Sequence, residues 1–299
     1  MSRIYCLSTV DLDQVFEIDH LPAHDEKIFA SAFHEGAGGQ GVFVARALAG
    51  LKAPVTFIGT VGDDLAGTVL IDELSAVPGI EVTIDRLPGV PTGTCAILVD
   101  RTGEKAIVLA PIHGDLVRRL GEDLAVADGD IVTVNFFDPA AIRSLFARVR
   151  GQGGRSIIDI EFTGIAIHGW DAAFETAASA DILCTNQTTL AAWCERESVS
   201  GGLIETAERF ALALAGGRRR VCVTLGGQGV LVHEEARSVH LPALPIRPVN
   251  TTGAGDTFLA GLAYGLWRGD TFVDAASLAT RVAADFLVHG KVDPERLGL

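Results

Sequence analysis

The chain has 299 residues, 48% of them hydrophobic, and a formal net charge of −14 at pH 7. The length suits one large domain or two small ones, and the hydrophobic content predicts a sizeable core and excludes a disordered chain. The negative charge argues against nucleic acid or an anionic membrane as a partner, because both bind basic surfaces. A nucleotide is still compatible with it, since glycine turns and a metal ion hold phosphates locally.

The five cysteines are scattered, without the spacing of a zinc or redox site: Cys6, Cys95, Cys184, Cys194 and Cys222. This pattern is typical of free thiols in a reducing compartment. No basic stretch precedes an apolar run at the start, and no apolar run is long enough for a membrane span. We therefore expect a cytoplasmic protein.

The first expected element is a short buried strand over residues 4–10, followed by Asp11 and Asp13. In open α/β sheets ligands bind beyond the carboxyl ends of the strands. The two carboxylates are therefore candidate substrate ligands. The same residues also fit a solvated loop, and this stretch alone does not decide between the two.

Two segments predict paired antiparallel strands instead of strand–helix units. In the first, two loosely alternating runs flank a turn at Pro22; in the second, a hairpin joins residues 94–100 to 105–110 through Arg101-Thr102-Gly103. We expect these ribbons to form a separate small sheet, a lid over a larger core. The lid is expected at residues 14–35 and 91–110, and the core at 1–13, 36–90 and 111–299.

A glycine turn lies between the ribbons. Gly36, Gly38 and Gly41 match the G-x-G-x-x-G pattern of dinucleotide-binding proteins, but residues 31–35 are too polar for the buried parallel strand which that pattern requires. We interpret the turn as a place where a small polar ligand rests against the backbone at a helix start. Gly38 and Gly39 are the candidate contacts.

From residue 131 onwards, short buried strands alternate with apolar helices, which predicts a doubly wound, mostly parallel sheet. Polar side chains follow three of these strands: Asn135, Asp159 with Glu161, and Asn186. Each alone is typical of a helix cap or turn, but together they favour a site. After the next strand, the glycine turn from Gly226 to Gly229 suits either nucleotide phosphates or a plain hairpin.

The stretch from Thr252 to Asp256 opens directly into an apolar helix. The first turn of a helix has unpaired N–H groups and the positive end of the dipole, and glycines let an anion approach them. An acid here is unexpected in a plain phosphate site, because two anions repel. It fits a turn that stabilises a phosphoryl group while Asp256 takes a proton from the attacking hydroxyl. An ordinary first-turn acid is the competing interpretation.

Residues 251–258, Thr-Thr-Gly-Ala-Gly-Asp-Thr-Phe, resemble the C-terminal signature of the PfkB (ribokinase-like) carbohydrate kinases. Other stretches resemble the same family in the same order and cover nearly the whole chain: the strand ending in Asp13, the Gly38-Gly39 turn, residues 57–67 and residues 224–229. The resemblance implies an α/β fold, with a doubly wound, mostly parallel sheet covered by helices on both faces and a small β lid closing over a sugar.

The resemblance also implies an ATP-dependent kinase for a small carbohydrate, with Asp256 as general base and Gly253, Ala254 and Gly255 as anion hole. The implied substrate contacts are Asp11, Asp13, Gly38, Gly39, Phe43, Asn135 and Asp256. The implied ATP contacts are Asn186, Thr224, Gly226, Gly229, Thr252, Gly253 and Gly255. Mg²⁺ would bind mainly through the phosphates, with Asp159 and Glu161 as further candidate ligands, and a monovalent cation is a candidate activator.

Some positions depart from the family pattern. Gln40 and Phe43 stand where the family commonly has a lysine and a sugar-binding asparagine, Thr189 replaces the Glu of an N-x-x-E motif, and Asn250 replaces an Asp. The stretch 103–107 with Pro111 resembles ketohexokinase-like and sulfofructose kinase-like members. Because Asn135 is not an arginine that would grip a charged sugar, we expect a neutral sugar or ketose.

Three other functions stay open. In a nucleoside kinase of the same fold Phe43 would stack on a base, although it also fits core packing under the glycine turn. A non-catalytic sugar sensor would explain the lost acidic positions but not an intact Asp256. A dinucleotide-binding oxidoreductase is the remaining alternative. The exposed edges of a two-ribbon lid also predict a homodimer formed through the lid.

Overall fold

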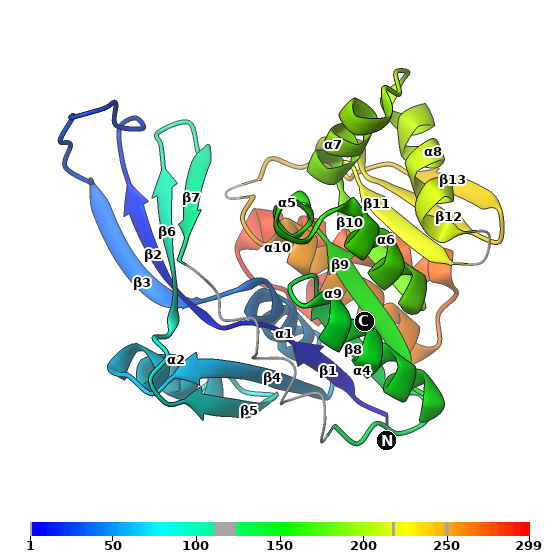
Figure 1. Ribbon diagram of the computed structural model, residues 1–299, viewed down its shortest axis with the longest axis horizontal. Helices are drawn as coiled ribbons and strands as arrows, with labels where there is room; N and C mark the ends of the chain where they lie inside the picture. The colour runs from blue at the N-terminus through cyan, green and yellow to red at the C-terminus, as the bar shows by residue number, and fades with distance from the viewer. Residues whose placement is uncertain (1, 111–123, 217–218, 249–250) are drawn as a thin grey trace.

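The computed structural model describes residues 2–110, 124–216, 219–248 and 251–299, so Pro111 and Asn250 lie outside it. The described chain has a nine-stranded sheet flanked by helices and a separate four-stranded sheet, which stands to one side in Figure 1. The predicted class, a doubly wound α/β core with a β lid, is confirmed. Within these ranges, no helix is long and apolar enough to cross a membrane.

The nine-stranded sheet has the order β13-β12-β11-β10-β9-β8-β1-β4-β5. Seven of its strands are parallel: β1 Ile4–Leu7, β4 Val55–Gly62, β5 Ile80–Leu87, β8 Ile131–Asn135, β9 Arg155–Ile160, β10 Ile182–Asn186 and β11 Arg220–Thr224. The last two, β12 Val230–Glu234 and β13 Arg237–Leu241, pair antiparallel at one edge. The carboxyl ends of the parallel strands therefore meet at one edge of the sheet, where ligands bind in such folds.

Helices cover both faces of this sheet, because neighbouring residues along its buried strands point to opposite sides. One cluster of buried residues joins the strands to α1 Gln40–Gly50, α2 Leu65–Ser75, α9 Ala254–Arg268 and α10 Phe272–His289. The other joins them to α4 Pro139–Gly151, α5 Phe162–His168, α6 Trp170–Ser179, α7 Gln187–Glu197 and α8 Leu203–Ala215. A short helix, α11 Pro294–Leu297, ends the chain.

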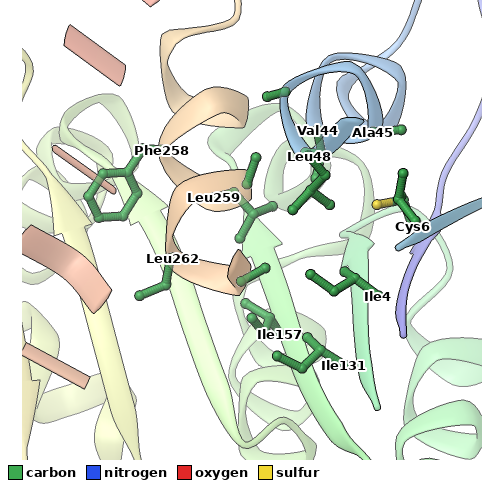
Figure 2. Packing of buried hydrophobic residues seen from close by; sticks show 14 of the residues in the cluster. Ile4, Cys6, Val44, Ala45, Leu48, Ile131, Ile157, Phe258, Leu259 and Leu262 are labelled. Carbon is green, nitrogen blue, oxygen red and sulfur yellow. The ribbon is translucent and has the colours of Figure 1, made fainter. Parts of the chain in front are cut away.

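The packing of α1 and α9 fixes the place of the two glycine turns. Leu48 of α1 and Leu259 of α9 lie against Ile4, Ile131 and Ile157 of the sheet (Figure 2). Each buried leucine or isoleucine contributes about 1.5–3 kcal/mol. This core therefore holds the N-termini of the two helices side by side, although their turns are far apart in the sequence.

The lid is the four-stranded sheet, with the order β3-β2-β6-β7. Its strands are β2 Asp11–Glu17, β3 Ala32–Gly38, β6 Gly93–Val99 and β7 Lys105–Leu109. The predicted hairpin is confirmed by the antiparallel pairing of β6 with β7. The sheet reaches beyond the expected lid ranges, because β2 and β3 pair down to Asp11 and Gly38. The expected first strand correspondingly ends at Leu7.

Candidate active site

Two predicted substrate carboxylates lie at the start of lid strand β2. Asp11 pairs with Gly38 and Gly93 on the neighbouring strands. A Cβ at Gly38 would overlap the Asp13 carboxyl group, and one at Gly93 would overlap that of Asp11. Glycine at both positions therefore lets the two carboxylates lie across the surface of the sheet.

Within the described ranges, the side-chain hydrogen bonds of these carboxylates come from Thr9 to Asp11 and from Cys95 to Asp13. Burial raises the pKa of Asp11, and burial together with the charge of Asp11 raises the pKa of Asp13 to about 6. Thr9 Oγ1 donates to Asp11 Oδ2 at 3.2 Å. A ligand with several hydroxyl donors would supply the hydrogen bonds that stabilise the ionised forms, so the pair suits a polyol.

The N-terminus of α9 is shaped by Gly253, which caps the helix with φ 78°. A Cβ there would lie 3.0 Å from Phe43 Cδ1, whereas a Cβ at Gly255 would meet no described atom within 4 Å. Phe43 therefore packs against the turn, and Gly255 faces open space. Of the three predicted anion-hole donors, the Ala254 N–H makes a long bond to the Thr251 carbonyl at 3.4 Å.

Asp256 lies in this first turn and stays partly exposed. Burial raises its pKa to about 8, the negative charge of Glu161 adds to the rise, and Lys105 opposes it. Such a carboxyl group takes up a proton near neutral pH, which is the property of an effective general base.

A second group of polar residues lies at the carboxyl ends of β9 and β10. Asn186 caps α7: its Oδ1 accepts from the N–H and Oγ1 of Thr189, at 2.9 and 3.0 Å. Its Nδ2 donates to Glu161 Oε1 at 3.1 Å. Burial, then Glu161 and Asp256, raise the pKa of Asp159 well above its usual range. The negative charges of Glu161 and Asp256 thus act on Asp159, and that of Glu161 also acts on Asp256.

This group fits a metal ion only as a partial ligand set. Within the described ranges, no three His, Cys, Asp or Glu side chains are placed to hold a metal. Mg²⁺ in phosphoryl-transfer sites keeps waters and phosphate oxygens and takes one or two carboxylates. Glu161 and Asp159 fit that role, since burial raises the pKa of both, and the charges of Glu161 and Asp256 add to the rise for Asp159.

The predicted nucleotide turn lies beside this group. Thr224 is opposite Asn186 in the β10–β11 ladder, and residues 226–228 form one 3₁₀ turn. Gly229 has φ 93°, and a Cβ there would overlap the Leu241 carbonyl. Position 229 must therefore be glycine because the chain leaving β13 packs against it. Whether Gly229 also contacts a nucleotide remains a prediction.

Asn135 ends β8 next to Asp159 of β9. Its side chain is 6% exposed, and its Nδ2 has no acceptor among the described residues. A buried donor left unpaired costs about 1–3 kcal/mol. A ligand that accepts this hydrogen bond would recover that energy, which agrees with the predicted substrate role without testing it.

Two features of the site were not predicted. Lys105 Nζ of the lid donates to Thr252 Oγ1, just before the α9 turn, at 3.0 Å. Asp64 caps α2 and also accepts from the N–H and Oγ1 of Thr92, at 2.9 and 2.6 Å, where the chain enters the lid. Both contacts join residues far apart in the sequence, and only the resemblance over residues 57–67 pointed to Asp64.

The fold and the site together define a carbohydrate kinase. A family model described as pfkB family carbohydrate kinase matches residues 6–287. The chain therefore belongs to this family.

Known relatives agree with this assignment. The chain is 29% identical to the bifunctional protein HldE of Bradyrhizobium; the match covers 81% of this chain and 50% of that protein. It is 27% identical to a ribokinase of Arabidopsis thaliana, over 93% of this chain and 74% of the relative. The crystal structure of phosphofructokinase-2 from Escherichia coli in complex with potassium is similar with a TM-score of 0.81 at 21% identity, covering 100% of this chain and 97% of that one.

Proposed function

We propose that the protein transfers the γ-phosphate of ATP to a hydroxyl group of a small neutral sugar or ketose, with Asp256 as the general base. The observation that carries this proposal is the place of Asp256, whose pKa is raised to about 8, in the glycine-lined first turn of α9. A general base in such a position contributes about 10²–10⁴-fold to the rate.

In the proposed reaction the acceptor oxygen forms a bond to the γ-phosphorus, and its proton passes to Asp256. The bond from the γ-phosphorus to the bridging oxygen breaks, and its electron pair leaves with ADP. The N–H groups at the start of α9 stabilise the developing charge, each worth about 10²–10³-fold. Mg²⁺ bound to the phosphates would neutralise part of their charge.

The sugar would lie between the lid and the core. Asp11 and Asp13 would accept hydrogen bonds from its hydroxyl groups, and the buried Nδ2 of Asn135 would donate one to it. The lid would exclude water, which otherwise competes as the acceptor. Potassium is a candidate activator, by analogy with the potassium complex of phosphofructokinase-2.

Two observations bear on the substrate. Phe43 packs against Gly253, which favours its role as a support of the α9 turn over stacking on a nucleoside base. The relatives named ribokinase and phosphofructokinase favour sugars and sugar phosphates, and Asn135 supplies no positive charge for a phosphate. A neutral sugar or ketose therefore remains our proposal.

A panel of acceptors tests it. ADP formation would be measured with ketoses, aldoses, sugar acids, sugar phosphates and nucleosides, each with Mg²⁺ and with either K⁺ or Na⁺. We expect the highest kcat/KM with a neutral sugar. Preference for a nucleoside would establish the alternative kinase, whereas tight sugar binding without any turnover would establish a sensor.

A further inference from the structure

Lys105, the first residue of β7, reaches from the lid to the core. Its Nζ donates to Thr252 Oγ1 at 3.0 Å, across 147 positions in the sequence. Thr252 directly precedes the Gly253 cap of α9. The lid therefore places an ammonium group beside the turn where the γ-phosphate is proposed to bind.

The same ammonium belongs to the face of the lid that carries the proposed sugar ligands. Side chains alternate along β7, so Lys105 and Leu109 share a face. Leu109 is opposite Cys95, and Cys95 is opposite Asp13. A residue on this face can act at the boundary between sugar and phosphate.

The charge of Lys105 acts on both sides of that boundary. It lowers the pKa of Asp13 on the lid, of Glu161 at the start of α5 and of Asp256 in α9, against the larger effect of burial on each. Gln40 follows the Gly38-Gly39 turn, and Arg46 of α1, which also lowers the pKa of Asp13, donates to the Ala37 carbonyl and to Glu73. The ammonium thus contacts the residue before the α9 turn, and its charge acts on both the proposed sugar ligand Asp13 and the proposed base Asp256.

The present partner of Lys105 at this turn is weaker than a phosphate would be. Thr252 offers a neutral hydroxyl oxygen, whereas hydrogen bonds between an ammonium and a phosphate oxygen are charge-assisted and roughly twice as strong. An incoming γ-phosphate would therefore compete well for Lys105. The contact with Thr252 holds the ammonium at the place where it would be needed.

We propose that Lys105 is a catalytic residue of the lid, which exchanges Thr252 for the transferred phosphoryl group when sugar and ATP are both bound. This inference rests on the proposed function. As the acceptor oxygen bonds to phosphorus, its proton goes to Asp256 and the electron pair of the breaking bond leaves with ADP. Lys105 keeps its proton and donates hydrogen bonds to the phosphoryl oxygens throughout.

Steady-state kinetics of four variants test the proposal. Lys105→Ala removes the group, Lys105→Gln keeps a hydrogen-bond donor without charge, Lys105→Arg keeps the charge, and Lys27→Ala removes an exposed lid lysine elsewhere as a matched control. We expect Lys105→Ala and Lys105→Gln to lower kcat about 10²-fold. The KM for sugar should change by less than about threefold, and Lys105→Arg should recover most of the loss. Lys27→Ala should match the wild type.

The pH profile separates a catalytic role from a structural one. Loss of Lys105 removes a cation that lowers the pKa of Asp256, so the acid limb of kcat/KM should move to higher pH in Lys105→Ala and stay in place in Lys27→Ala. If kcat of Lys105→Gln equals that of the wild type, Lys105 is only a latch to Thr252 and the inference is wrong. A wild-type protein without turnover on any acceptor would instead remove the proposed function, and this inference with it.

Discussion

At the scale of the residue, the proposed role of Asp256 makes activity depend on the ionisation of this carboxyl group. Its pKa rises from an ordinary value of 3.8 to about 8, chiefly because of burial, so the neutral form prevails at pH 7 before ligands bind. A general base must be ionised to take a proton. We expect kcat/KM to increase with pH up to about pH 8 and then to level.

The measurement is kcat/KM at saturating Mg²⁺ and limiting sugar, from about pH 5.5 to 9.5. The same assay without the kinase serves as the control at each pH. A profile that is flat between about pH 6 and 8 would contradict a base with this pKa.

The same carboxyl group should make the fold less stable as pH rises. Between about pH 4 and 8 the unfolded chain has released a proton that folded Asp256 retains, so the free energy of unfolding falls through this window. Asparagine cannot ionise. Asp256→Asn should therefore melt above the wild type at pH 8, by about 2–4 °C for each kcal/mol relieved.

This difference should shrink as the pH falls towards 4 and vanish below it, where Asp256 is protonated in both the folded and the unfolded wild type. Asp25→Asn, an exposed change in the lid, is the control and should melt like the wild type at each pH. A wild type that melts at the same temperature as Asp256→Asn at pH 8 would show that burial of the charge has no cost.

At the scale of the element, Asp64 joins α2 to the lid. It accepts from the Gly67 N–H at 2.8 Å as a helix cap and binds Thr92 at the entry to β6. Gly62 permits this approach, since a Cβ there would overlap the Val90 carbonyl. We infer that residues 62–64 anchor one end of the lid to the core.

Asp64→Ala should lower the free energy of unfolding by about 1–3 kcal/mol and raise the KM for sugar, because it removes the cap and both bonds to Thr92. Asp63→Ala is the matched control, since its neighbouring carboxylate makes one exposed ion pair with Arg86 at 3.9 Å. Exposed pairs contribute about 0–1 kcal/mol. Urea unfolding that gives equal losses for both variants would exclude the anchor.

Elements with strong periodicity were predictable, and those at edges were not. The parallel strands β8 to β11 and the helices between them follow from buried apolar runs and their spacing. The sequence pattern does not reveal β5, because it is an edge strand with the charged residues Glu81 and Asp85 at alternate positions. It does not reveal β13 either, which lies at the other edge of the sheet and follows a two-residue turn. The short helix α5 has too few turns for a clear period.

The site divides in the same way. The helix that starts at the Gly253 turn, with Asp256 in its first turn, was predictable because the signals of a helix N-terminus are local. The proposed roles of Lys105 and Asp64 depend on where the lid lies against the core, which no local pattern contains. Gly229 shows the converse, since its glycine is explained by the chain packed against it.

At the scale of the whole molecule, the lid has exposed apolar side chains, and β7 is an edge strand among the described residues. Phe29 is 99% exposed, Val108 is 64% exposed and Phe33 is 52% exposed, and β7 lies at the edge of the sheet. Such edges pair with another chain unless they are protected. We propose that two copies associate through their lids.

Sedimentation velocity tests this association. We expect a dimer at micromolar concentration, and Val108→Asp should shift it towards monomer because a charge would be buried at the contact. Leu212→Asp is the control, since that side chain is also exposed but lies on α8, which packs on the nine-stranded sheet and is not part of the lid. A wild type that stays monomeric at high concentration would remove the dimer.

The most direct test of the central claim is phosphoryl transfer by Asp256→Asn under single-turnover conditions, with the best sugar of the panel and ATP binding measured in parallel. We predict that transfer falls by about 10²–10⁴-fold while ATP still binds with the affinity of the wild type. Transfer at a rate near that of the wild type would contradict the assignment of Asp256 as the general base.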